Sequence, residues 1–193
     1  MKTRCPWVSD DPMMIHYHDK EWGVPVHDDS LLFEFLILEG AQAGLSWTTI
    51  LKKRENYRVA FNNFEPEKVA AYDNGKIEEL RNNPGIVRNK LKIGSAVTNA
   101  SLILELITEF GSFNSFIWKF VDGIPIQNNW EKLSDIPSST PESKKMSKEL
   151  KRRGFKFVGP TICYSFMQAV GMVNDHTVDC FRHHQLKSEI SEK

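Results

Sequence analysis

Two cysteines and two histidines lie in pairs near opposite ends of this 193-residue chain. Cys5 and His18 are near the N-terminus, and His176 and Cys180 are near the C-terminus. Thiolates and imidazoles are the ligands that zinc favours in tetrahedral sites, and two of each are typical of a structural zinc ion. If one ion binds all four side chains, it joins the two ends of the chain.

The spacing leaves alternatives open, because His16, His183 and His184 are competing ligands. A catalytic zinc usually has three protein ligands and one open position, whereas four protein ligands close the coordination shell. The four-residue set therefore favours a structural ion over one that activates water. His176 and Cys180 are four residues apart, and a helix would place both on one face.

Composition indicates which partners and compartment to expect. Lysine plus arginine equals aspartate plus glutamate at 25 each, so no overall positive charge indicates a polyanionic partner. Seven basic residues nevertheless lie close together and could bind a polyanion locally: Lys144, Lys145, Lys148, Lys151, Arg152, Arg153 and Lys156. Three cysteines do not indicate a disulfide scaffold. We find no signal-peptide pattern, and the longest apolar stretch, 33–38, is too short to span a membrane, so we expect a soluble cytoplasmic protein.

The hydrophobic pattern predicts an all-α fold, because no stretch shows convincing period-two alternation. Helices are expected over 31–38, from Ser46 to Phe61, in a short segment after Pro66, over 87–110 and over 113–120. Gly40 and Gly44 are expected to interrupt the first of these. Residues 122–141 contain three prolines and are expected to form a loop.

A further helix pair is predicted over 141–153 and 160–171, joined by a short turn. Gly154 suits a left-handed helix C-cap, and Pro160 suits the first position of the next helix. Such a turn can direct backbone N–H groups and a helix N-terminus towards a phosphate. An ordinary helical hairpin with a charged, solvated face has the same pattern, so phosphate binding is a hypothesis at this point.

The segment 39–47 is a candidate pocket. It places Glu39 at the end of an apolar helix, two glycines in a turn, and Trp47 at the start of the next helix. Small residues allow the backbone or ring of another molecule to approach closely. A simple corner with a buried tryptophan and a solvated glutamate explains the same residues, and the spacing does not separate these readings.

Together these segments resemble the bacterial 3-methyladenine DNA glycosylase I family, over nearly the whole chain. The most specific matches are Cys5-Pro6-Trp7-Val8, Tyr17-His18-Asp19-Lys20-Glu21-Trp22-Gly23, 38–47 and 153–159, continued by 161–169. The resemblance implies a monofunctional glycosylase that hydrolyses the N-glycosidic bond of N3-methyladenine in alkylated double-stranded DNA, as a step of base excision repair.

The expected architecture follows from the same resemblance. It implies a single glycosylase domain over 1–185, with two helical lobes around a cleft and a helix-hairpin-helix motif at about 142–171. Residues 186–193 are expected to form a polar tail, and the protein is expected to be a monomer. The resemblance also favours Cys5, His18, His176 and Cys180 as the ligands of a structural zinc ion that joins the termini.

The resemblance assigns roles to individual positions. Glu39 is the candidate catalytic residue and binds the base together with Tyr17 and Trp47, while Trp7 and Trp22 are neighbouring pocket aromatics. DNA contacts are expected from the hairpin and from the turn after Glu39, at Gln42, Leu45, Lys156, Val158, Gly159 and Thr161.

Two positions differ from other helix-hairpin-helix glycosylases. Thr161 occupies the place of the lysine that bifunctional members use, so Schiff-base strand cleavage is not expected. Asn174 occupies the place of the usual aspartate, and an amide cannot act as a general base. N3-methylation makes the base cationic in DNA and weakens its glycosidic bond, so little acid catalysis is needed. An indole face and a carboxylate both attract such a cation.

Two other functions remain as alternatives. One is a DNA-binding module without enzymatic activity, in which the hairpin is the anchor and the pocket is a structural corner. The other is a glycosylase that accepts a wider range of alkylated bases. Release of free methylated base separates the first alternative from the enzyme, and competition between N3-methyladenine and N7-methylguanine tests the second.

Overall fold

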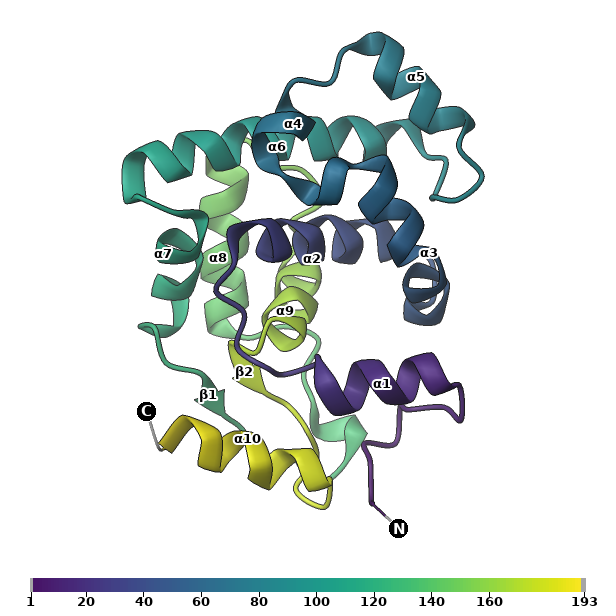
Figure 1. Ribbon diagram of the computed structural model, residues 1–193. Coiled ribbons are helices and arrows are strands. Elements are labelled where there is room, and N and C mark those ends of the chain that lie inside the picture. The colour runs from purple at the N-terminus through teal and green to yellow at the C-terminus, as the bar shows by residue number, and fades with distance from the viewer. Residues whose placement is uncertain (1, 192–193) are drawn as a thin grey trace.

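The computed structural model describes residues 2–191 and is mainly helical in that range, as predicted (Figure 1). The helices are α1 Pro12–Lys20, α2 Asp29–Gln42, α3 Trp47–Ala60, α4 Pro66–Ala70, α5 Asn74–Asn82, α6 Lys90–Phe110, α7 Phe113–Trp118, α8 Pro141–Arg152, α9 Pro160–Ala169 and α10 Phe181–Ser191. Short 3₁₀ turns lie at 62–64, 119–121 and 133–135.

Helix α2 lies at the centre of the molecule and carries the first half of the candidate pocket. Ten of its fourteen residues are buried, and it contacts α3, α6, α7 and α9. Such a helix is apolar on all sides because other helices surround it. In Figure 1 it lies between α6 on one side and α9 on the other.

The predicted interruption at Gly40 is wrong, because α2 continues to Gln42. Gly40 remains helical, and a Cβ atom there would lie 3.1 Å from the Cβ of Phe157 in the hairpin. The glycine therefore permits close packing between α2 and the hairpin. The predicted turn at Gly44 is confirmed by its positive φ of 81°.

The predicted caps of the later helices are confirmed. The Ser46 side chain accepts a hydrogen bond from the Thr49 backbone N–H at the start of α3. Gly154 after α8 has a φ of 99°, in the left-handed region that glycine adopts readily. Pro160 is the first residue of α9.

Several other elements differ from the prediction. Residues 12–20 form the helix α1, and neither it nor α5 is among the helices predicted from the sequence. His176 and Cys180 do not lie on a helix but in the segment before α10. Helix α10 crosses the boundary predicted at residue 185, and Leu186 is fully buried, so residues 186–191 are not a free tail. The end of that predicted tail, 192–193, lies outside the described residues.

The predicted loop 122–141 contains one short strand. Ile126–Gln127 (β1) pairs in parallel with Val173–Asn174 (β2), with Ile126 opposite Val173. This two-residue pairing leaves the fold mainly helical. It also brings the loop against the segment that carries His176.

By length and composition alone, α6 resembles a membrane-spanning helix. Polar residues such as Asn99 and Ser101 interrupt its apolar sequence. The indication is weak, because central helices of water-soluble domains meet the same criteria. Seven residues of α6 are buried, and it packs against α2, α4, α5 and α7.

Candidate functional site

The four predicted metal ligands come together in one buried cluster. Cys5, His18, His176 and Cys180 each offer an atom, and these atoms lie within 4.8 Å of one another. The His18 Nε2 and His176 Nδ1 atoms are 3.2 Å apart. The Cys180 Sγ lies 3.4 Å from that His18 nitrogen and 3.5 Å from that His176 nitrogen.

The separations of 3.2 to 3.5 Å are close to the edges of a zinc-centred tetrahedron. With ordinary zinc–nitrogen and zinc–sulfur bonds, two nitrogens lie about 3.4 Å apart and a nitrogen and a sulfur about 3.6 Å apart. Cys5 Sγ lies 3.4 Å from His176 Nδ1, which fits the same edge. The residues present therefore fit a closed Cys₂His₂ site.

Hydrogen bonds on the far side of each imidazole fix which nitrogen faces the cluster. His18 Nδ1 pairs with Asp19 Oδ1 at 2.7 Å, and Arg4 holds that carboxylate through two hydrogen bonds. Arg4 also keeps the pKa of Asp19 low, at about 2. His176 Nε2 lies 3.0 Å from the Trp22 carbonyl oxygen. Such outer contacts are typical of metal-binding histidines.

The competing histidines lie elsewhere. His16 and His184 are exposed, and His183 Nε2 lies 2.8 Å from the Asn128 carbonyl oxygen. None of the three belongs to the cluster among the described residues. The structure therefore brings together the two cysteines and the two histidines that the family resemblance favoured.

The five residues predicted to surround the base line one cavity of about 390 Å³. They are Trp7, Tyr17, Trp22, Glu39 and Trp47. The rings form two neighbouring pairs, with centroids 5.3 Å apart for Tyr17 and Trp47 and 4.9 Å apart for Trp7 and Trp22. The cavity has room for a purine ring within an aromatic wall.

Glu39 is the buried carboxyl group of this cavity. It comes from the last turns of α2, its residue is 5% exposed, and no side-chain hydrogen bond to it is made within residues 2–191. Burial raises its pKa to about 8. Burial and the nearby Glu39 also raise the pKa of Tyr17 well above its ordinary value. The pocket therefore favours a neutral Glu39 until a cation or a hydrogen-bond donor enters.

Two donors in the same cavity lack partners. The indole N–H groups of Trp7 and Trp47 are buried, and neither makes a hydrogen bond of good geometry within the described part of the chain, although the Trp47 N–H lies near enough to the Tyr17 hydroxyl to lower the pKa of that group slightly. Most buried N–H groups are paired, because an unpaired donor is costly. Unpaired donors beside an unpaired carboxyl group are what a site for a polar ligand requires.

The structure adds pocket residues that the sequence did not identify. Met14, Thr48, Leu133, Ile136, Ser165 and Gln168 complete the lining, together with Gln42, which the sequence marked as a DNA contact. Leu133 and Ile136 come from the loop before α8, and Ser165 and Gln168 come from α9. No local pattern marks them, because they reach the cavity through tertiary packing.

Asp175 organises this second wall of the cavity. Its carboxylate accepts hydrogen bonds from Asn128, Trp130, Tyr164 and Gln168, at 2.5 to 2.8 Å. The first two donors belong to the loop that carries Leu133, and the others belong to α9. Asp175 is 1% exposed and its carboxylate accepts four hydrogen bonds, whereas the Glu39 carboxyl group accepts none within the described residues.

A smaller hollow of about 210 Å³ adjoins the cavity and shares Glu39, Gln42 and Ser165 with it. Leu45 and Thr161 line this hollow, so the turn after α2 and the start of α9 face each other. The side chain of Leu45 is 42% exposed. Three of the predicted DNA contacts therefore lie beside the entrance of the cavity.

The hairpin supplies the remaining predicted contacts. Lys156 and Thr161 are exposed, and Gly159 is partly exposed. The side chain of Val158 is 2% exposed, and its carbonyl accepts a hydrogen bond from Ser147, so only its backbone N–H is left for a DNA contact.

The basic residues of the hairpin divide into two groups. Arg152 and Arg153 are held in ion pairs with Glu149, and Arg153 also pairs with Glu109. No ion pair within the described part of the chain involves the lysines, which are exposed: Lys144, Lys145, Lys148, Lys151 and Lys156. The free positive charge of this surface therefore comes from lysine.

Comparisons with known proteins identify the family of this chain. A sequence model of the methyladenine glycosylase family matches residues 7–183. DNA-3-methyladenine glycosylase 1 of Escherichia coli (strain K12) is 54% identical over 177 residues, which cover 92% of this chain and 95% of the relative.

Two solved structures are also similar to this chain. A crystal structure of 3-methyladenine DNA glycosylase I has a TM-score of 0.91 at 54% identity, covering 93% of this chain and 98% of that one. A variant of 3-methyladenine DNA glycosylase I in complex with 3-methyladenine has a TM-score of 0.89 at 40% identity, covering 92% and 96%.

Proposed function

Because this chain belongs to the methyladenine glycosylase family, we propose that it releases N3-methyladenine from alkylated DNA by hydrolysing the N-glycosidic bond. The aromatic cavity with its one buried carboxyl group carries the proposal. The observation is specific, because one hollow brings the buried Glu39 carboxyl group together with the rings of Tyr17 and Trp47.

Recognition begins when the damaged nucleotide leaves the DNA stack and enters the cavity, which requires a few kcal/mol of unstacking energy. Trp47 and Tyr17 stack on the base, and Glu39 accepts hydrogen bonds from its N–H donors. The positive charge of the methylated base lowers the pKa of Glu39 from about 8, so the carboxylate forms when the base binds. A neutral adenine provides less of this interaction, which supplies the selectivity.

The chemical step needs little proton transfer. The bond from C1′ of the deoxyribose to the base nitrogen breaks, and its electron pair neutralises the cationic base. Water forms the new bond to C1′ and releases one proton to the solvent. The ionised Glu39 stabilises the positive charge that develops on the sugar as the base leaves. Thr161 supplies no amine for a Schiff base, so hydrolysis ends at the abasic site.

DNA binding is assigned to the hairpin and the adjacent turn. The exposed lysines of α8 and Lys156 attract the phosphate backbone, and the backbone N–H groups near Gly159 bind a phosphate at the start of α9. The turn from Gln42 to Leu45 then faces the gap left by the displaced nucleotide. This arrangement suits double-stranded DNA, which alone has such a gap.

A zinc ion bound by Cys5, His18, His176 and Cys180 is proposed as a structural cofactor. Four protein ligands leave no open position for water, and the ion would stabilise the fold where the two ends meet. The ring of Trp22 lies 4.6 Å from His176 and that of Trp7 lies 5.3 Å from His18. Through these contacts the ion would also support one wall of the base cavity.

The remaining proposals concern organisation. The cavity has α1–α3 with the segments flanking α1 on one side, and α9 with the loop before α8 on the other, which supports two lobes around a cleft. We propose a monomer, the simplest form that can scan DNA, and a cytoplasmic location, which a DNA substrate supports.

Base release from alkylated DNA, with chromatographic identification of the free base, tests the function. We expect free N3-methyladenine, and Glu39→Gln should reduce its excision by roughly 10²-fold, because the amide cannot carry the charge that the cation requires. Unchanged excision by a folded Glu39→Gln protein would remove Glu39 from the mechanism. The absence of any released base would favour a DNA-binding module, and equal release of N7-methylguanine would indicate a wider range.

A further inference from the structure

The end of α2 is packed directly against the hairpin, away from the base cavity. A Cβ on Gly40 would lie 3.1 Å from the Phe157 Cβ and 3.6 Å from its carbonyl oxygen. Phe157 has a φ of 55°, a left-handed conformation that is uncommon for an aromatic residue and that the surrounding contacts must maintain. This close contact holds the end of α2 and the hairpin at one fixed spacing.

We call the contact between the end of α2 and the hairpin, at Gly40 and Phe157, the joint. Lys92 of α6 binds the end of α2 at this joint. Its Nζ donates hydrogen bonds to the carbonyl oxygens of Ala41 and Ala43, each at 2.7 Å. The last carbonyls of a helix lack partners within the helix, and a cation satisfies them well. These two carbonyls lie at the start of the exposed turn that ends at Leu45. Lys92 therefore sets the direction in which that turn leaves α2.

Asn99 of α6 binds the backbone of the hairpin through two hydrogen bonds. Its side-chain amide donates to the Lys156 carbonyl at 3.0 Å and accepts from the Lys156 backbone N–H at 2.9 Å. Asn99 is 1% exposed. Because both backbone groups of Lys156 are bound, the plane of the hairpin just before Phe157 is fixed relative to α6.

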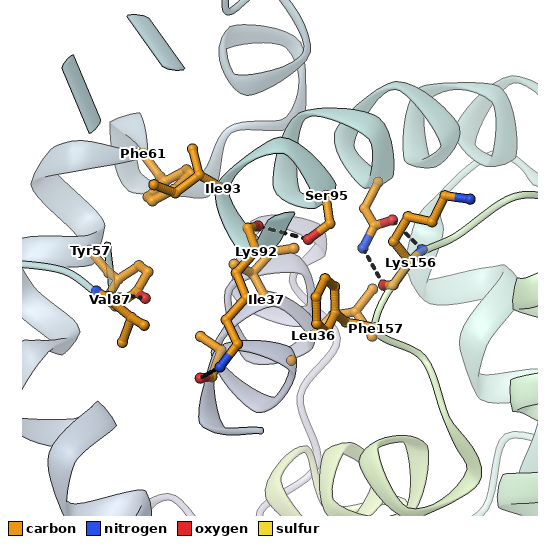
Figure 2. A pocket seen from close by; sticks show the side chains of 13 residues that line it. Leu36, Ile37, Tyr57, Phe61, Val87, Lys92, Ile93, Ser95, Lys156 and Phe157 are labelled. Atoms are coloured by element: carbon orange, nitrogen blue, oxygen red, sulfur yellow. Dashed lines mark hydrogen bonds between the residues drawn. The ribbon is translucent and has the colours of Figure 1, made fainter. Parts of the chain in front are cut away.

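Lys92 and Asn99 are seven residues apart, which is two helical turns or about 10 Å along one face of α6. Figure 2 shows the joint, with Lys92 extending along Ile37 and Lys156 on the far side of Phe157. One rigid helix thus contacts both the turn that faces the lesion and the hairpin that faces the phosphates. The residues around the joint leave almost no free space, so neither contact is free to relax into a cavity.

We propose that Lys92 and Asn99 are positioning residues that fix the distance between the hairpin and the 42–45 turn, so that both engage one damaged duplex together. This inference rests on the proposed function. The hairpin anchors the phosphate backbone, and the turn reaches the gap only if its spacing from the anchor matches the DNA. Neither residue contacts the base, so neither contributes to affinity for the free base.

The experiment compares duplex DNA containing a stable abasic-site analogue with the same duplex undamaged. In Lys92→Met, which keeps the chain length but has no donor, we expect the preference for the abasic-site duplex to fall about tenfold, in line with the effects of misplaced binding groups. Asn99→Ala should give a similar loss. Affinity for free 3-methyladenine should stay within about twofold of the original, as expected when the cavity itself is intact.

Two further variants separate geometry from charge and stability. Lys90→Met removes an exposed lysine from the same helix and should leave the preference unchanged. Lys92→Arg keeps donors for both carbonyls and should restore most of it. A loss in Lys92→Met that merely equals that of Lys90→Met, or a lower melting temperature with an unchanged preference, would overturn the proposal. If the original protein neither releases base nor prefers the abasic site, the proposed function fails instead.

Discussion

The metal cluster and the base cavity share an aromatic wall, but the polar groups of the cluster have hydrogen-bond partners and those of the cavity do not. In the cluster, His18 and His176 each have a partner on the outer side, and Arg4 holds Asp19 in turn. In the cavity, Glu39 has no hydrogen-bond partner among the described residues, and neither do the indole N–H groups of Trp7 and Trp47. The polar groups of the cluster are therefore satisfied within the protein, whereas those of the cavity await a ligand.

The difference shows where the fold is stabilised and where it is destabilised for function. Partnered groups fix one geometry and add stability, whereas unpartnered buried groups reduce stability until a ligand binds. The contact between Trp22 and His176 places the two regions side by side. The metal cluster can thus support the wall of the base cavity.

The largest expected effect is the loss of the cluster. Cys180→Ala removes one ligand, and stripping the metal removes the ion, so each should reduce the free energy of unfolding by on the order of 5 kcal/mol or more. Chemical denaturation and metal analysis by mass spectrometry measure this. Cys163→Ala is the matched control, because this third buried cysteine lies outside the cluster and should cost roughly 1–2 kcal/mol with the metal content unchanged. A Cys180→Ala protein as stable as the control would show that the cluster is not a structural metal site.

The next effect concerns Glu39 and pH. Its folded pKa of about 8 lies above the ordinary value of 4.5, so between these values the unfolded chain loses a proton that the folded protein keeps. Stability therefore falls as pH rises from about 4.5 to 8, by up to roughly 5 kcal/mol from this group. Glu39→Gln should lack this contribution and become relatively more stable with rising pH. Denaturation at pH 5 and pH 8 tests it, and parallel pH profiles for the two proteins would contradict the raised pKa.

Two tryptophans allow satisfied and unsatisfied groups to be compared by the same substitution, tryptophan to phenylalanine, at two positions. The Trp118 N–H donates to the Val26 carbonyl at 2.8 Å, whereas the Trp47 N–H has no partner within the described residues. Trp118→Phe should reduce stability by about 1–2 kcal/mol, because it leaves a buried carbonyl unpaired. Trp47→Phe should change stability less and weaken binding of free 3-methyladenine several-fold, through lost stacking area. Calorimetry measures both quantities, and equal effects of the two variants on base binding would contradict the assignment of Trp47.

The smallest expected effect is on the DNA-binding surface. Lys156 is exposed and has no ion pair among the described residues, whereas Arg152 is paired with Glu149. Lys156→Gln should weaken binding to any duplex and reduce the slope of log affinity against log salt by about 1. Arg152→Gln should change the slope less, because it also frees an acidic group. A larger change in this slope for Arg152→Gln than for Lys156→Gln would indicate that DNA contacts the other face of α8.

Much of the local structure follows from sequence patterns. Ser46, Pro66, Pro160 and Gly154 mark helix ends because capping and left-handed turns depend on neighbouring residues. Gly40 misled the prediction, because its role is contact with Phe157, more than a hundred residues away. The short helix α5, with only Leu80 buried, gave too weak an apolar pattern to be recognised.

By itself, the sequence determined the mainly helical class, the four metal-type residues and the aromatic residues around Glu39, because each of these depends on residue type and motif. Only the tertiary structure decided that Leu133, Ser165 and Gln168 complete the cavity, and that Lys92 and Asn99 join the turn to the hairpin. It also decided that Glu39 lacks a partner and is hard to ionise. Burial and partnership depend on contacts between distant segments, and local patterns do not contain that information.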